Sequence, residues 1–293
     1  MEEIAKNVYI EDKYPGVTLG VISQPRGLIQ IDAPPSPEDG RSWRASLMGM
    51  GNGPERVLIN LDAHPDRTLG VRAMDCTVIA HEKTAQEFRN RPNTFKAQGD
   101  ETGSNWEAIP GLGSVRWAPP EISFVDKMSL YWNDAPIVLE SHPGPTSGAI
   151  WVILPEEKIV FVGDAVIKGQ PPFLAYADLP AWIETLNRLL EPEYKGFTII
   201  SSRGGVVNTQ VVRHQVEVLK RIHDRLEKLG KKKSAIGATD KLAEQFLKDF
   251  RAPAVRQKQY LHRLRYGLNY YYARHYQPPP VIHWMSSGRP ASL

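Results

Sequence analysis

This sequence has little cysteine, no long apolar run and no marked excess of charge of either sign. Cys76 is the only cysteine among 293 residues, so an internal disulfide and a zinc site built from several cysteines are excluded. No apolar stretch is long enough to span a bilayer, and residues 1–15 contain no apolar segment typical of a secretory signal. The 36 basic and 33 acidic residues nearly balance, which by itself indicates neither a nucleic-acid nor a membrane partner. We therefore predict a cytoplasmic protein.

The apolar residues that are present form two groups of predicted strands. The first group lies at residues 8–10, 17–22, 27–31, 57–61 and 78–80. The second group lies at residues 122–124, 129–132, 136–140, 150–154 and 159–162, and one more strand is predicted at residues 197–200. The close spacing of the second group predicts a mostly antiparallel sheet. Because helical patterns follow each group, we expect a two-sheet α/β sandwich rather than an all-parallel sheet.

Helical patterns are clearest in the second half of the chain. Asp178 is placed to cap a helix whose apolar stripe begins at Trp182. A longer apolar repeat begins at Val212, and Gly230 is placed to end that helix. Further helices are predicted at residues 82–88, around 242–250, and from 261 to 271, before the prolines at 278–280.

An Asp- and His-rich turn follows the buried strand at 57–61. It reads Asp62-Ala63-His64-Pro65-Asp66-Arg67. Side chains two positions apart at the end of a strand share a face, and a tight turn brings the next ones to the same place. A cluster of this kind suits a metal ion that activates water.

This turn resembles the metallo-β-lactamase superfamily, whose motif His-x-His-x-Asp-His closes a strand and opens a helix. The resemblance extends from about Asn7 to about Leu229, and further segments carry it at residues 28–32, 79–85, 143–148, 160–164 and 199–205. It implies an α/β fold, the four-layer αβ/βα sandwich of this superfamily, with extra C-terminal helices. Residues 1–230 would form the superfamily domain, and residues 231–293 a helical extension packed on it.

Most of the metal ligands that the resemblance implies are replaced. Of seven family positions, three keep the family residue, namely His64, Asp66 and Asp164. Asp62 stands where the first histidine of the motif belongs, and Arg67 replaces its last histidine.

Two further positions of the family pattern also differ. Arg203 stands where the family has its final histidine ligand. Pro145 falls at the histidine position of the third turn, and His142, three residues earlier, could take its place only if that turn is rearranged. The sequence leaves the choice between Pro145 and His142 open.

These replacements change the charge of the site. Arginine cannot bind a metal ion, because its guanidinium stays protonated and has no free lone pair. The three carboxylates at 62, 66 and 164 and the two arginines at 67 and 203 leave a formal charge of −1. Asp–Arg pairing can satisfy buried carboxylates without metal, so we favour a salt-bridged cluster. The alternative is one divalent ion (Zn, Fe or Mn) held by Asp62, His64 and Asp164, with His142 as a fourth ligand.

Three functional hypotheses follow from the resemblance. The first is a superfamily protein that has largely lost its dinuclear metal site, lacks normal dinuclear hydrolase activity and binds a small carboxylate or phosphate beside Arg67 and Arg203. The second is a mononuclear metal-dependent hydrolase of an ester, thioester, lactone or amide. Asp66 would then orient or deprotonate the water, and Arg203 would stabilise the oxyanion. The third is a structural or assembly role through the C-terminal helices, which would make the protein a homo-oligomer.

The last predicted helix carries basic and aromatic side chains. Arg256, Arg263 and Arg274 fall on one stripe near several tyrosines, a pattern that could bind single-stranded nucleic acid. We favour the simpler interpretation, in which the leucines of this helix pack on the protein and its arginines and tyrosines lie at the surface. For His81, beside Glu82, we expect packing at a helix start rather than metal binding.

Overall fold

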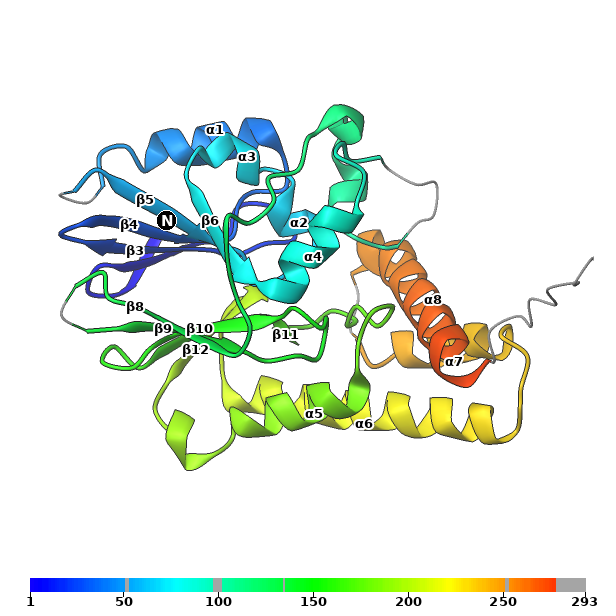
Figure 1. Cartoon of the computed structure of the whole chain (residues 1–293). Helices are drawn as coiled ribbons and strands as arrows, with labels where there is room; N and C mark the ends of the chain where they lie inside the picture. Colours follow the sequence, from blue (N-terminus) through cyan, green and yellow to red (C-terminus); the bar gives the residue numbers. More distant parts are fainter. Residues whose placement is uncertain (51–52, 97–101, 134, 251–252, 278–293) are drawn as a thin grey trace, which may run out of the picture.

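Two β-sheets lie face to face, and helices cover the outer side of each sheet (Figure 1). The computed structural model describes residues 1–50, 53–96, 102–133, 135–250 and 253–277. An apolar cluster that includes Ile29, Ile59, Val152 and Phe161 fills the space between the sheets. Separate apolar clusters join each sheet to its helices. The predicted four-layer αβ/βα sandwich is confirmed.

The first sheet has strand order β1-β2-β3-β4-β5-β6-β7. Its strands are β1 (Glu2–Ala5), β2 (Val8–Glu11), β3 (Leu19–Gln24), β4 (Gly27–Ile31), β5 (Glu55–Ile59), β6 (Thr77–His81) and β7 (Ile122–Phe124). Strands β1 to β4 pair antiparallel, and β4 to β7 pair parallel. The carboxyl ends of the parallel strands β5 and β6 therefore meet at one edge of the sheet.

The second sheet has strand order β13-β12-β11-β10-β9-β8. Its strands are β8 (Lys127–Leu130), β9 (Ile137–Ser141), β10 (Ile150–Leu154), β11 (Ile159–Ile167), β12 (Thr198–Arg203) and β13 (Gly205–Val207). It is mostly antiparallel, as predicted, and only β11 and β12 run parallel. The prediction was wrong for residues 122–124, because β7 pairs with β6 in the first sheet. Spacing along the chain does not reveal which sheet a strand joins.

The helices cover the sheets and supply the short turns between strands. They are α1 (Pro37–Ser46), α2 (Pro65–Thr68), α3 (Val71–Met74), α4 (Glu82–Asn90), α5 (Leu179–Arg188), α6 (Thr209–Lys231), α7 (Ala238–Leu247) and α8 (Ala254–Tyr276). Single 3-10 turns lie at Trp106–Ala108, Leu112–Ser114 and Pro192–Tyr194. Asp178 caps α5 by accepting from the backbone N–H of Ala181, so that prediction is confirmed.

Gly230 does not end a helix, as the sequence had suggested, because α6 continues to Lys231. Its role is spatial. A Cβ atom at Gly230 would lie 2.3 Å from the Cδ1 atom of Tyr276. The missing side chain lets the end of α8 approach α6, where the Tyr276 hydroxyl donates to Glu227.

Helices α7 and α8 pack on the rest of the chain. Leu264 and Leu268 of α8 belong to the apolar cluster that also contains Leu186 of α5 and Leu219 of α6. The division into a superfamily domain at residues 1–230 and a helical extension at residues 231–293 stays a prediction, and the prolines at 278–280 lie outside the described residues. No helix in the described part of the chain has the length and apolar character needed to cross a membrane.

Candidate functional site

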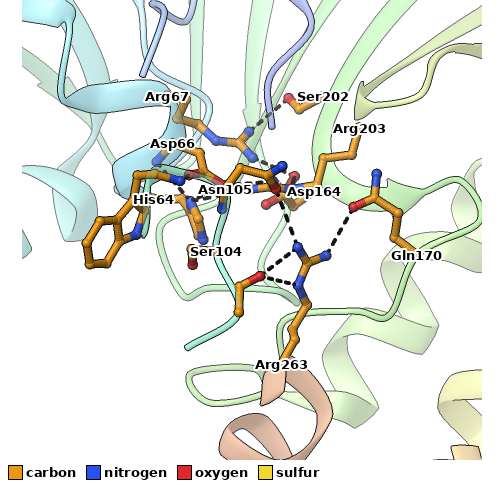
Figure 2. Close-up of polar contacts among 12 residues, drawn as sticks. His64, Asp66, Arg67, Ser104, Asn105, Asp164, Gln170, Ser202, Arg203 and Arg263 are labelled. Atoms are coloured by element: carbon orange, nitrogen blue, oxygen red, sulfur yellow. Dashed lines mark hydrogen bonds and ion pairs between the residues drawn. The ribbon is translucent and has the colours of Figure 1, made fainter. Parts of the chain in front are cut away.

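The candidate site lies where β5, β11 and β12 end, between the two sheets. Asp62 follows β5 and Asp164 lies within β11, while Arg203 is the last residue of β12. The short helix α2 begins directly after His64, with Pro65 at its first position. This start presents His64, Asp66 and Arg67 to the second sheet, where they meet Asp164 and Arg203 (Figure 2). Asp62, which Figure 2 does not label, joins them through its ion pair with Arg67.

Arg67 is the central cation of the cluster and is fully buried. Its Nε atom lies 3.1 Å from Asp62 and its Nη2 atom 2.5 Å from Asp164. Its Nη1 atom lies 3.4 Å from Asp32 and donates to the Ser202 hydroxyl at 2.9 Å. One guanidinium thus faces two carboxylates that follow β4 and β5 and a third that lies within β11.

Arg203 is the second cation, and it is 3% exposed. Its Nε atom donates to Asp164 at 3.0 Å, and its Nη1 atom donates to Asp66 at 2.8 Å. Its Nη2 atom lies 3.3 Å from Nδ1 of His64. Its guanidinium also lies over the ring of Phe173, 4.5 Å from the centroid. Arg67 and Arg203 together contact every carboxylate of the motif.

His64 is held as a neutral acceptor. Its Nδ1 atom accepts from the backbone N–H of Asp66 at 3.2 Å and faces the guanidinium of Arg203. Because both neighbours are N–H donors, Nε2 carries the ring proton. Burial, reinforced by the nearby arginines, lowers the pKa of His64 to about 3. With 13% of its side chain exposed, His64 has the most solvent-exposed side chain of the cluster.

Burial and the arginines act in opposite directions on the carboxylates. Burial would raise the pKa of both Asp66 and Asp164, but the guanidinium of Arg203, together with weaker contributions from His64 and from hydrogen bonds, outweighs it and lowers both pKa values. For Asp62, burial prevails over the attraction of Arg67, and its pKa is raised. Two carboxylates are therefore firmly ionised, and a third is less so.

Asp32 was missed as a site residue, although it lies in one of the segments that carry the resemblance. It is completely buried and has a φ of 60°, in the left-handed region. Its Oδ1 atom accepts from the backbone N–H of Leu61, which ties β4 to the end of β5. Burial raises the pKa of Asp32 to about 7 despite the nearby Arg67.

Two distant segments complete the cluster, and the motif gives no sign of either. Asp66 accepts backbone N–H groups from Asn105 at 3.2 Å and Trp106 at 2.6 Å. The side chain of Asn105 accepts from Arg203 and also from Arg263 of α8 (Figure 2). With Asp32 and Arg263 included, four carboxylates and three guanidiniums again leave a formal charge of −1.

His142 lies apart from the cluster. Its ring is stacked on Trp151 with centroids 3.7 Å apart, and its Nε2 atom lies 3.4 Å from Glu140. Its backbone N–H is bonded to Ala149 across the turn that contains Pro145. Among the described residues, no group of three or more His, Cys, Asp or Glu side chains is arranged to hold a metal ion. A metal role for Asp62, His64, Asp164 and His142 together thus stays an untested prediction without geometric support.

His81 caps a helix. Its Nδ1 atom accepts from the backbone N–H of Lys83 at the start of α4. Its Nε2 atom then carries the proton and faces the Ser141 hydroxyl at 3.2 Å. In this tautomer His81 cannot take a proton from Ser141, so the pair is not an activated nucleophile.

The basic stripe of α8 lies only partly at the surface, where Arg256 and Arg274 are exposed as expected. Arg263 is 1% exposed, contrary to the surface position expected for it. Arg274 donates to the backbone carbonyl of Ala175, and Arg256 to the side chain of Gln259. A hollow of about 360 Å³ lies elsewhere, between α6 and α7, and is lined by Arg221, Asp224, Arg225, Lys228, Gln245 and Phe246. No residue of the cluster lines this hollow.

Comparison with known proteins identifies the fold. The family model "Metallo-beta-lactamase superfamily" matches residues 63–195. A metallo-beta-lactamase from Pontibacter korlensis is 20% identical with a TM-score of 0.59, over 75% of this chain and 97% of that chain. The DIM-1 metallo-beta-lactamase is 17% identical with a TM-score of 0.58, over 75% of this chain and 96% of that chain.

A larger protein also resembles the chain. The sec-alkylsulfatase Pisa1 from Pseudomonas sp. is 14% identical with a TM-score of 0.62, over 93% of this chain and 49% of that chain. At these identities the likeness shows the fold alone. The sequence matches no curated protein.

Proposed function

We propose that the chain is a member of the metallo-β-lactamase superfamily whose metal centre has been replaced by a cluster of guanidinium and carboxylate groups. We infer that it does not hydrolyse substrates by the dinuclear metal route. The cluster instead stabilises the junction of the two sheets. Any ligand recognition at this place would then depend on fixed positive charge rather than on a metal-activated water.

One observation carries this proposal, namely that Arg67 and Arg203 engage all the carboxylates of the motif. Asp164, which aligns with the family's bridging ligand, lies 2.5 Å from Arg67 and 3.0 Å from Arg203. The guanidinium groups carry no lone pair for a metal, and their charges repel a cation. The lone pair of His64 Nδ1 also faces two N–H donors. This donor set does not fit the metal centre that the superfamily implies.

Metal content of the purified protein tests the proposal directly. We expect elemental analysis of protein prepared without chelator to find no stoichiometric metal, and EDTA to leave the melting temperature unchanged. A gain-of-metal variant is the matched control: Asp62→His, Arg67→His and Arg203→His together restore imidazoles at three family positions. One or more metal ions per chain in the natural protein, with a melting temperature that EDTA lowers, would refute the proposal and favour the mononuclear hydrolase.

A second candidate function is binding of a small carboxylate or phosphate at the open side of the cluster. The side chain of His64 is the most exposed of the group, and Nη2 of Arg203 lies beside it, 3.3 Å from the Nδ1 atom of that ring. An anion there would find a guanidinium that cannot lose its proton. Isothermal titration with inorganic phosphate and with acetate, at constant ionic strength, should give saturable heats that Arg203→Lys weakens. Heats that stay linear up to high concentration would remove this candidate.

An assembly role for the C-terminal helices has less support. Leu264, Leu268, Tyr271 and Tyr272 of α8 are buried within the chain itself. The apolar side of this helix therefore needs no second protein to cover it. A single species of monomer mass in multi-angle light scattering, at concentrations up to the millimolar range, would rule out a homo-oligomer.

A further inference from the structure

Helix α8 reaches the ion-pair cluster with two polar side chains. The Nε2 atom of Gln259 donates to the backbone carbonyls of Gly103 at 3.2 Å and Ser104 at 3.3 Å. Arg263, one turn further along, donates to the same Gly103 carbonyl from Nε at 3.0 Å and from Nη2 at 2.8 Å. Three N–H groups thus converge on one carbonyl oxygen.

Arg263 also holds a second segment, the one that follows β11. Its Nη1 atom donates to the side chain of Gln170 and to the backbone carbonyl of Pro171, both at 3.2 Å. Its guanidinium lies over the ring of Phe173, 4.0 Å from the centroid. One side chain therefore joins residues 103–105 to residues 170–173, which we call the cover segments (Figure 2).

The first cover segment contacts the cluster directly. The backbone N–H of Asn105 donates to Asp66, and its side-chain oxygen accepts from both Arg203 and Arg263. Gly103 permits this arrangement, because it has a φ of 74° and a Cβ there would lie 2.6 Å from the backbone nitrogen of Arg263. The backbone of the segment therefore lies against α8 with no side chain between them.

Because Arg263 is charged, its burial and the position of the cover segments depend on each other. All the acceptors it contacts among the described residues are neutral, although the side chain is almost completely buried. Burial, together with the neighbouring Arg203, lowers its pKa to about 9. A buried cation that loses its acceptors is strongly unfavourable. The segments therefore stay in place while Arg263 is buried, and Arg263 stays buried only while they are in place.

We propose that α8 is a latch, with Arg263 fastening both cover segments beside the ion-pair cluster, so that solvent reaches the buried Asp66 and Arg203 on the side of Asn105 and Phe173 only when α8 releases these segments. The latch acts through Asn105 and Phe173, which contact Arg203. It does not depend on whether the cluster binds a metal or an anion. Its failure in a test would therefore leave the proposed function untouched.

Hydrogen exchange measured by mass spectrometry on the full chain tests the latch. In Arg263→Met, peptides spanning residues 102–108 and 168–177 should exchange at least about tenfold faster than in the natural protein, because the N–H groups of Asn105 and Trp106 lose their fixed acceptor geometry at Asp66. Strand β10 should exchange unchanged. Arg265→Met is the matched control, since Arg265 lies on the same helix and pairs with Glu244.

A second variant covers the case in which Arg263→Met fails to fold. Gln259→Ala removes two hydrogen bonds to the first cover segment and leaves the buried charge in place. It should speed exchange at 102–108 more than at 168–177, since the two hydrogen bonds that Gln259 donates both go to the first segment. Unchanged exchange in the cover segments, or an equal increase across β10, would overturn the latch.

Discussion

Replacing Arg67 by Met should be among the most destabilising changes available to this protein. The substitution keeps most of the side-chain volume and leaves Asp32, Asp62 and Asp164 facing one another without their shared cation. Removing one partner of a buried ion pair typically costs about 3–5 kcal/mol. Since whole domains are stable by only about 5–15 kcal/mol, the variant should unfold at a much lower denaturant concentration.

The loss should also depend on pH in a defined direction. Without Arg67 the pKa values of Asp32 and Asp62, which burial already raises, rise further in the folded state. A carboxyl whose folded pKa is raised contributes stability that is lost as the pH increases through that pKa. The difference between Arg67→Met and the natural protein should therefore widen from pH 5 to pH 8.

Guanidinium chloride unfolding, followed by circular dichroism at several pH values, measures both effects. Arg26→Met is the matched control, because the Arg26–Glu55 pair is about half exposed and such pairs contribute at most about 1 kcal/mol. A loss below about 1 kcal/mol at pH 8, or one that is equal at pH 5 and pH 8, would refute the view that Arg67 neutralises the cluster.

Three further changes have expected results that the same unfolding assay checks. Asp32→Asn should remove a stability contribution that is complete below about pH 4 and lost as the pH rises through about 7, since burial raises the pKa of this carboxyl from 3.8 to about 7. His64→Phe should act in the opposite direction. The natural protein loses stability as the pH falls from 6.5 to about 3, because only the unfolded chain protonates this histidine there, and the variant should lose less stability over this range. Gly230→Ala, which in an open helix would gain up to about 1 kcal/mol, should instead destabilise the protein, because the new Cβ meets Tyr276. Adding Tyr276→Ala should reverse that loss, and a stabilised Gly230→Ala single variant would contradict the close packing of α6 and α8.

The sequence predicts best those site residues that lie close together along the chain. Asp62, His64, Asp66 and Arg67 lie within one turn, so the motif predicts their proximity. Asp164 and Arg203 are placed by the family pattern, since each belongs to a strand of the second sheet. Their pairing with the turn was expected from charge alone, and the distances agree with it.

The remaining parts of the site come from contacts that no local pattern encodes. Arg263 is 160 residues from Gly103, which accepts its hydrogen bonds. In the sequence it fell on a stripe with Arg256 and Arg274, and helical periodicity cannot distinguish a buried arginine from an exposed one. Its position next to the buried Leu264 was the available signal. For His142, the sequence could not show that Trp151 lies across the turn and stacks on its ring.

The ring of Phe173 lies under two guanidinium groups, those of Arg203 and Arg263. Two like charges so near each other repel, yet each is attracted to the electron-rich surface of the same benzene ring. An aliphatic residue of equal bulk would separate the charges without attracting either. Aromaticity at position 173 is therefore what allows a third arginine to be accommodated beside a centre that already holds two.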